Sequence, residues 1–235
     1  MKNHPIYRRI YDYEKKYYIN HQDSLVDYVF LILTIAQKVL DESSAIEAPN
    51  MENVSDPYLY LRVNKGARVF IYIAYNKYVS LSFPFNVKKE GNTVRLYINK
   101  INTEIGNKII SECISIIKQM QKNSSLIDVW MESDDPFSEI SLRIIDYLLH
   151  TEPCYLRYDY DLDNANGFIH PLNHFDINMS KIGHIKLGLY NKLTFKQFLD
   201  ILNPETNCYY LSSPMMDYNN KKMTLKNKRK RKRIR

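Results

Sequence analysis

Residues 58–85 read YLYLRVNKGARVFIYIAYNKYVSLSFPF and decide the fold class of this 235-residue chain. Three runs within it, 58–63, 67–74 and 77–85, combine β-branched and aromatic residues and are separated by short turns, which is typical of adjacent antiparallel strands. The turn NKG at 64–66 suits a tight hairpin because glycine accepts a positive φ. The middle run is apolar on both faces, so we expect it to be a central strand.

Two further features extend this sheet. The third run alternates, which predicts one buried face and one exposed face. After a turn at Gly91-Asn92, the run TVRLYIN at 93–99 predicts a fourth strand of the same meander. The alternation predicts burial of Val79, Leu81, Phe83 and Phe85 and exposure of Ser80 and Ser82.

Five segments are predicted to be helices. Most carry apolar residues at helical spacing, which gives each an apolar stripe that a sheet or another helix must cover. The expected helices are 5–20, 24–40, 103–121, 137–150 and 195–202, with N-caps at Asp23 or Ser24, at Thr103, and at Thr194 in a capping box with Gln197. We expect 103–121 to cover the sheet and Trp130 to pack between two helices.

The fold class is therefore α+β. An antiparallel meander of about four strands, joined by a C-terminal hairpin and a short strand at 184–189, packs against several helices. We expect a single domain over 1–212, with a possible subdivision near 125–136, and a flexible basic tail over 213–235.

Composition excludes several classes of protein. No G-x-G-x-x-G or G-x-x-x-x-G-K occurs, which argues against Rossmann and P-loop nucleotide chemistry. Three widely spaced cysteines indicate a reducing, cytoplasmic compartment. The N-terminus lacks the order of a signal peptide, and the most apolar run, 29–36, is too short to span a bilayer, so we expect no membrane association.

Residues 155–177, YLRYDYDLDNANGFIHPLNHFDI, hold the candidate site. The turn residues at 163–167 predict a hairpin, and Pro171 favours an edge position or a bulge on the returning strand. Strand alternation gives the hairpin one polar face. The residues of that face are Arg157, Asp159 and Asp161 on the first strand and His170, His174 and Asp176 on the second.

The polar face is compatible with a structural or a catalytic role. Arg157 could pair with Asp159 or Asp176 and tie the strands together, because a guanidinium matches a carboxylate. Alternatively, His174 or His170 could act as general acid or base, oriented by Asp159, while Arg157 stabilises developing negative charge, as in a hydrolase or nuclease.

A metal role is the third alternative. On a straight strand His170 and His174 would lie roughly 13 Å apart, too far to share an ion unless Pro171 bends the chain. His174 and Asp176 could bind one together with Asp159 or Asp161, if the hairpin register brings those residues opposite. The spacing matches no standard zinc pattern, so the sequence predicts no metal and no cofactor.

The C-terminal half also resembles a known family. The runs LRYDYD, HPLNHFDIN and HIKLGLYNKLTFKQFLDIL, over about 150–205, resemble bacterial proteins grouped as domain of unknown function number 2290. The matching residues are Arg157, Asp159, His170, Pro171, His174 and Phe198, whereas His184 stands where the family has an arginine. The resemblance implies importance for the hairpin and a defence or mobile-element context, but no activity.

The charge is concentrated at the C-terminus. Residues 221–235 hold ten of the 33 Lys and Arg residues and no acid, which leaves 1–220 with 23 basic and 26 acidic residues, a net charge of −3. Such a basic run neutralises phosphates and releases their counterions, although it is also typical of a solubilising tail. The residues expected to bind nucleic acid are Lys228, Arg229, Lys230, Arg231, Lys232 and Arg233.

These patterns predict a cytoplasmic bacterial accessory protein, in antiviral defence or a mobile element, that engages nucleic acid through its tail. A hydrolase or nuclease that uses the hairpin is the first alternative. A binding partner for the product of a neighbouring gene is the second.

Overall fold

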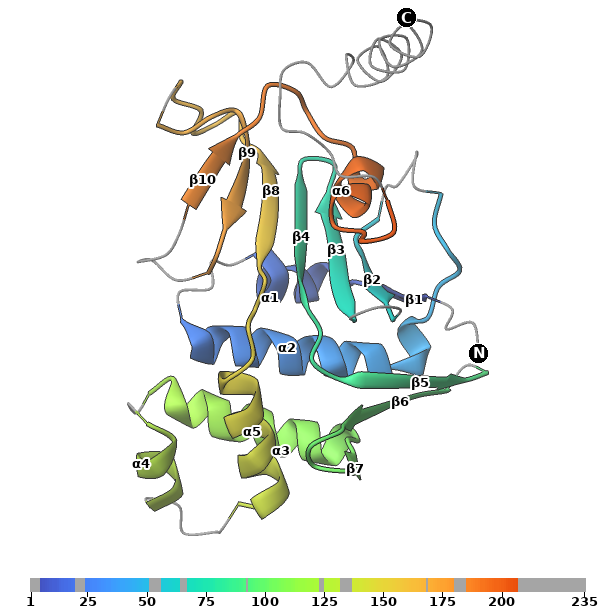
Figure 1. Ribbon diagram of the computed structural model, residues 1–235, viewed down its shortest axis with the longest axis vertical. Helices are drawn as coiled ribbons and strands as arrows, with labels where there is room; N and C mark the ends of the chain where they lie inside the picture. The colour runs from blue at the N-terminus through green and yellow to red at the C-terminus, as the bar shows by residue number, and fades with distance from the viewer. Residues whose placement is uncertain are drawn as a thin grey trace, which may run out of the picture.

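The computed structural model shows an α+β fold with two antiparallel sheets (Figure 1). None of the helices in the part of the chain that it describes is both long and apolar enough to span a bilayer. It describes residues 5–19, 24–50, 56–63, 67–91, 93–122, 125–131, 137–167, 169–179 and 185–206. The turn at 64–66, His184, the proposed boundary at 212 and the basic tail fall outside these ranges.

The larger sheet has seven strands in the order β1-β2-β3-β4-β8-β9-β10, and all neighbours pair antiparallel. The meander β2-β3-β4 is confirmed, and β3 is buried on both faces as expected. The predicted hairpin supplies β8 and β9. The bounds are β1 Ile6–Arg9, β2 Tyr58–Arg62, β3 Arg68–Ala74, β4 Lys77–Ser82, β8 Leu156–Tyr160, β9 Asn173–Ile177 and β10 Ile185–Gly188.

The expected fourth strand of the meander forms, but in the smaller sheet. That sheet consists of β5 (Asn86–Glu90), β6 (Thr93–Ile98) and β7 (Thr103–Glu104). β4 ends at Ser82, and Pro84 follows, which has no N–H to donate to a ladder. The chain therefore leaves the large sheet there, and residues 86–90, for which no strand was predicted, form β5.

The helices begin close to the predicted starts, with two corrections. Ser24 caps α2 by accepting from the Asp27 N–H, and Thr194 forms the predicted capping box with Gln197. Thr103 lies in β7 rather than at a cap, and segment 5–20 begins as strand β1 before its helical turns. The bounds are η1 Asp12–Glu14, α1 Lys15–Ile19, α2 Leu25–Leu40, η2 Glu42–Ser44, α3 Asn107–Met120, α4 Leu126–Met131, α5 Glu139–Leu149 and α6 Phe195–Ile201.

Helix α2 is the centre of the aliphatic core. It lies between the large sheet and a lower layer made of α3, α5 and the small sheet (Figure 1). Helix α3 was expected to cover the sheet, but it packs on α2 and α5 instead. The prediction was wrong because α2 already covers that face of the large sheet. Apolar residues lie on more than one side of α2, so this helix contacts both layers.

Two predictions about exposed positions in the lower layer were also wrong. Trp130 on α4 is 56 % exposed rather than packed between helices. The apolar spacing over 137–150 predicts that Ile140, Ile144, Ile145 and Leu148 point inward from α5, but Ile140, in the first turn of the helix, is 36 % exposed. Three other predicted inward residues of α5, Ile144, Ile145 and Leu148, are buried.

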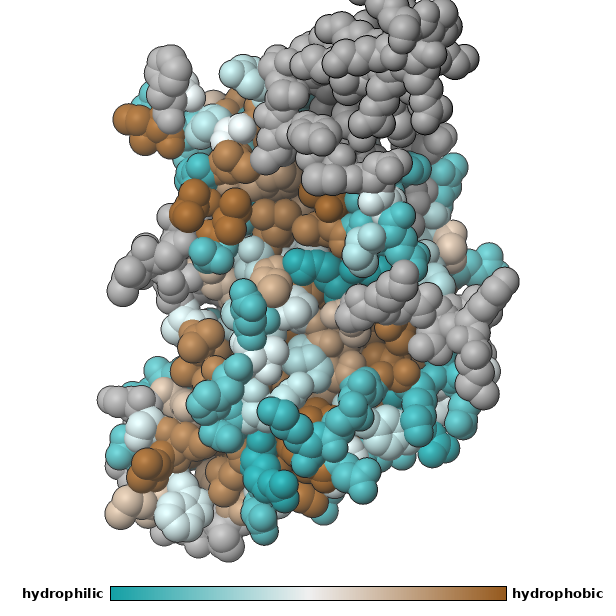
Figure 2. All heavy atoms as spheres, viewed as in Figure 1, coloured by the Kyte–Doolittle hydropathy of each residue, from teal (hydrophilic) through white to brown (hydrophobic). Residues whose placement is uncertain are grey.

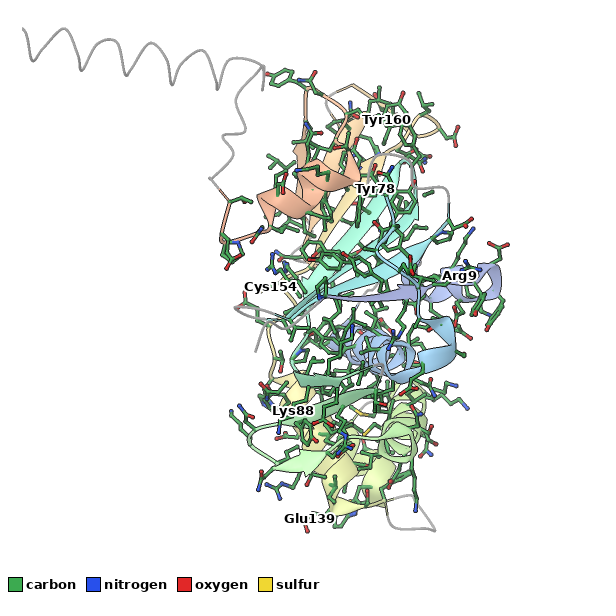
Figure 3. All side chains as sticks on the ribbon, turned by 90° about the vertical axis from the view of Figure 1, so that its right-hand side faces the viewer. Arg9, Tyr78, Lys88, Glu139, Cys154 and Tyr160 are labelled. Carbon is green, nitrogen blue, oxygen red and sulfur yellow. The ribbon has the colours of Figure 1, made fainter. Side chains whose placement is uncertain are left out.

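The opposite face of the large sheet is aromatic. One row of side chains crosses five strands in register, Tyr58, Tyr72, Tyr78, Tyr158 and Phe175. Phe195 and Phe198 of α6 pack onto this row. Figure 3 shows Tyr78 and Tyr160 at the opposite end of the molecule from Glu139. We call this set of seven residues, with Phe70, the aromatic face.

The aromatic face explains a wrong prediction about the serines of β4. Val79, Leu81, Phe83 and Phe85 are buried as expected, but Ser80 is buried too, and Ser82 is half-buried. Helix α6 covers the face that was expected to meet water. The hydroxyl of Ser80 donates to the Val69 carbonyl, which satisfies its hydrogen bond inside the sheet.

Candidate functional site

The candidate site lies on the face of β8, β9 and β10 that points away from α6. Strand alternation puts Arg157 and Asp159, His174 and Asp176, and Lys186 on that face. Apolar side chains occupy the α6 side of the same strands, and Figure 2 shows them gathered over β9 and β10. The predicted polar face is thus confirmed for Arg157, Asp159, His174 and Asp176, whereas Asp161 and His170 lie outside the two strands.

Register brings these side chains into two rows. Lys77 of β4 lies opposite Asp159, which lies opposite His174. In the neighbouring row, Arg157 lies opposite Asp176, which lies opposite Lys186. Side chains directly across an antiparallel pair are close enough to interact. We call the set Lys77, Arg157, Asp159, His174, Asp176 and Lys186 the ionic cluster.

Arg157 joins the two carboxylates. Its Nε donates to Asp159 Oδ2 over 2.7 Å, and its Nη2 donates to Asp176 Oδ2. Burial lowers the pKa of the guanidinium, but its electrostatic interactions with Tyr155, Asp159 and Asp176 outweigh burial and raise this pKa above its usual value. Arg157 is therefore charged at every accessible pH. Arg157 was expected to pair with Asp159 or Asp176, and the structure shows that it pairs with both.

Asp176 stays ionised although its side chain is 1 % exposed. Burial alone would raise the pKa of its carboxyl group. The hydrogen bond from Lys186, whose Nζ lies 2.8 Å from Asp176 Oδ1, and the charges of Arg157 and Lys186 outweigh burial and lower this pKa to about 2.

His174 is held in one tautomer. Its Nδ1 lies 2.7 Å from the carbonyl oxygen of Pro171, which can only accept, so the proton sits on Nδ1. Burial lowers the pKa of the imidazole, and the ammonium of Lys186 acts in the same direction. The lone pair of Nε2 faces the cluster, where it accepts from Lys186 Nζ at 3.1 Å.

Gly188 permits this arrangement of Pro171. It lies opposite His174 on β10, and a Cβ added there would come within 3.0 Å of Pro171 Cγ and 3.2 Å of Pro171 Cβ. Any side chain at this position would push Pro171 away. The carbonyl that fixes the His174 tautomer therefore depends on a residue without a side chain.

The predicted pairing of His174 with Asp159 takes a different form. His174 Nε2 lies 3.9 Å from Asp159 Oδ2 and 3.8 Å from Asp176 Oδ2, so neither carboxylate is hydrogen-bonded to the imidazole. Lys186 fills the role of hydrogen-bond partner instead. Asp159 Oδ1 is buried and accepts no hydrogen bond from the described residues, with Lys77 Nζ 3.4 Å away as an ion-pair partner.

His170 lies beside the cluster but outside it. Pro171 bends the chain, so the rings of His170 and His174 are 4.7 Å apart between centroids rather than the 13 Å of a straight strand. His170 is not part of β9; it lies in the turn and forms a bridge with Asn166. Its Nε2 is 3.2 Å from Asp161 Oδ2 but forms no hydrogen bond with the described residues, so these two predicted residues are neighbours in the turn.

The ionic cluster is mostly covered. The side chains of His174 and Asp176 are 1 % exposed, that of Asp159 is 7 % and that of Arg157 is 10 %. Lys77 and Lys186, at 30 % and 28 %, form its exposed rim. A ligand that approaches from solvent therefore meets ammonium groups first.

Two members of the cluster, Lys77 and Lys186, are not predicted by the sequence alone. Lys186 is the one polar residue of β10, and Lys77 begins β4, so each carries a weak signal of facing a polar partner. The partner is fixed by strand register, which no local pattern gives. The predicted tail residues, Lys228 to Arg233, lie outside the described part of the chain.

A scan against protein-family models and searches of the curated proteins and of the solved structures find no match to this chain. The resemblance to domain of unknown function number 2290 stays a prediction.

Proposed function

We propose that the protein binds nucleic acid through its basic C-terminal tail and hydrolyses a phosphodiester bond at the ionic cluster. One observation carries the proposal: three lone-pair groups, from Asp159, His174 and Asp176, converge in a site surrounded by three cations. Phosphoryl transfer needs both kinds of group. A lone pair takes the proton that the nucleophile must lose, and cations offset the negative charge that the phosphoryl oxygens gain.

The cluster suits each step of such a hydrolysis. A water oxygen bonds to phosphorus while the bond to the leaving oxygen breaks. The water proton goes to a carboxylate oxygen of the cluster, and the leaving oxygen takes a proton from the ammonium group of Lys186. Arg157 and Lys77 offset the charge on the phosphoryl oxygens. The two lysines at the rim are the first groups that a phosphate would meet.

The tail supplies affinity rather than chemistry. Six consecutive basic residues, Lys228 to Arg233, release counterions on binding, so affinity falls steeply with salt. The body, with its net charge of −3, offers little such attraction. The proposed setting is the bacterial cytoplasm, in a defence or mobile-element context, which the family resemblance supports.

Binding is tested by comparing the full chain with a chain that ends at Asn220, on single- and double-stranded DNA and RNA, at about 50 and 200 mM salt. The full chain is expected to bind with a strong salt dependence, and the shorter chain to lose most of its affinity. Equal affinity of the two chains would contradict a role for the tail.

Cleavage is tested with His174→Gln. We expect the rate of cleavage to fall about 100-fold or more, with the melting temperature within a few degrees of the parent. His150→Gln is the matched control, because His150 is the C-cap residue of α5 and its side chain is 77 % exposed. Equal rates for His174→Gln and the parent would exclude the cluster as the chemical site.

A second candidate function is docking onto another protein. The exposed side chains of α4, Ile127 at 66 %, Trp130 at 56 % and Met131 at 74 %, favour it, since exposed tryptophan and methionine are enriched at interfaces. Co-expression with the product of a neighbouring gene, with and without Trp130→Ser, tests it. Copurification that survives the substitution would contradict docking through α4.

A further inference from the structure

Three ligand atoms in the ionic cluster have the spacing of a metal site. Asp159, His174 and Asp176 each offer one atom, and the three atoms lie within 4.8 Å of one another. His174 Nε2 is 3.9 and 3.8 Å from the Oδ2 atoms of the two carboxylates. With metal–ligand bonds near 2.1 Å, two ligands of one ion lie roughly 3–4 Å apart, so small movements suffice.

A second observation is independent of this spacing. Asp159 is 5 % exposed, and within the part of the chain that the structure describes its Oδ1 accepts no hydrogen bond. A buried carboxylate oxygen without a hydrogen bond is costly. The ammonium of Lys77, at 3.4 Å, compensates part of its charge. A cation bound by the Asp159 carboxylate would offset the cost of burying this oxygen.

A third observation concerns Lys186. Its ammonium group bridges His174 Nε2, at 3.1 Å, and Asp176 Oδ1, at 2.8 Å. An imidazole lone pair and a carboxylate oxygen that converge on one positive charge are also what a metal ion requires. Lys186 comes from the edge strand β10, and its side chain is 28 % exposed, so it can turn towards solvent.

We infer that Asp159, His174 and Asp176 are ligands of a divalent transition-metal ion that competes with the ammonium group of Lys186. The set combines imidazole with two carboxylates, which favours Mn²⁺ or Zn²⁺ over Mg²⁺ and Ca²⁺, whose sites use oxygen alone. The hydrogen bond from His174 Nδ1 to Pro171 orients the ring as an outer-shell partner does in metal sites.

Charge explains why the lysine must leave. The cluster holds two carboxylates and three cations, so a divalent ion added to it would meet a net positive charge. Release of Lys186 from Asp176 removes one of these charges from the ligand group. The freed ammonium lies at the rim, where it can pair with a phosphate. The inference deepens the proposed function and rests on it for the choice of site.

Metal binding is measured without nucleic acid, by titrating the full chain with Mn²⁺ and following free Mn²⁺ by electron paramagnetic resonance. Lys186→Met is expected to bind Mn²⁺ at least tenfold more tightly than the parent. His174→Gln and Asp176→Asn are expected to bind at least tenfold more weakly. Zn²⁺ is expected to displace the bound Mn²⁺.

Lys196→Met is the matched control, because Lys196 lies on α6 and pairs with Asp200, away from the cluster. It is expected to leave Mn²⁺ affinity unchanged. Circular dichroism shows which variants fold, and Lys186→Met, at the exposed rim, keeps the test valid if the buried variants do not.

The inference is overturned if Lys186→Met binds Mn²⁺ no more tightly than the parent, or if no variant that retains the ligands binds it. Its failure is distinct from that of the proposed function. Tight Mn²⁺ binding without cleavage of nucleic acid would retain the metal site and reject the hydrolase. Cleavage that is insensitive to Mn²⁺, Zn²⁺ and chelator would retain the hydrolase and reject the metal site.

Discussion

Both faces of β8 and β9 are buried, but one is lined by aromatic rings and the other by charged side chains. On one face Tyr158 and Phe175 continue a row of rings that α6 covers; on the other, Arg157 and Asp176 continue a row that is aliphatic on β2, β3 and β4. Burying rings stabilises without strict geometry, whereas burying charges is costly unless every partner is present. The aromatic face therefore accounts for stability, and the ionic cluster requires another explanation.

The largest effect is expected from the aromatic face. Phe198 is fully buried, and its ring lies 5.8–6.4 Å from those of Phe70, Tyr78, Phe175 and Phe195. Phe198→Ala leaves a cavity under α6 and should lower the free energy of unfolding by about 4 kcal/mol, measured by urea denaturation. A loss below about 1 kcal/mol would show that α6 contributes little to the fold.

A slightly smaller loss of stability is expected when one charged partner is removed from the ionic cluster. Asp176→Ala leaves Arg157 and Lys186 without their shared partner and should lower the free energy of unfolding by about 3 kcal/mol. The control removes the whole group. Arg157→Met, Asp159→Leu and Asp176→Leu together should leave stability within about 1 kcal/mol of the parent, because no buried charge loses its partner. A triple variant that unfolds would show that the cluster holds the strands together.

The smallest expected effect is a pH dependence of stability that comes from the aromatic face. Burial raises the pKa of Tyr158 from 10.0 to about 12, so its neutral form is favoured in the folded protein. A raised pKa contributes stability that is present below the unfolded value and lost as pH rises towards the folded one. Between pH 8 and 11 the parent should lose about 1 kcal/mol more than Tyr158→Phe does. Parallel stability profiles for the two proteins would contradict the shift.

The sequence predicts the local parts of this comparison well. The cap at Ser24, the capping box at Thr194 and the alternation of β8 and β9 each depend on a few neighbouring residues, and all three are confirmed. The family resemblance and the tail residues stay predictions. Where a few neighbouring residues decide the local geometry, the sequence is sufficient to predict it.

The failures come from pairings between distant segments. β6 was assigned to the large sheet because its pattern fits either sheet, and β4 pairs with β8 across more than 70 intervening residues. Ser80 is buried because α6, far along the chain, returns to cover it. Lys186 enters the site only through the register of β9 and β10. Such choices depend on which surfaces meet, and local sequence does not encode them.

This separation also orders events during folding. Five members of the ionic cluster lie within residues 157–186, so they can assemble from a contiguous three-stranded unit with short loops. Docking that unit onto β4 must await closure of a long loop, and Lys77 joins only then. We therefore expect the site to assemble locally before its strands dock onto β4, and local opening of the β4–β8 pairing to uncover its buried carboxylates.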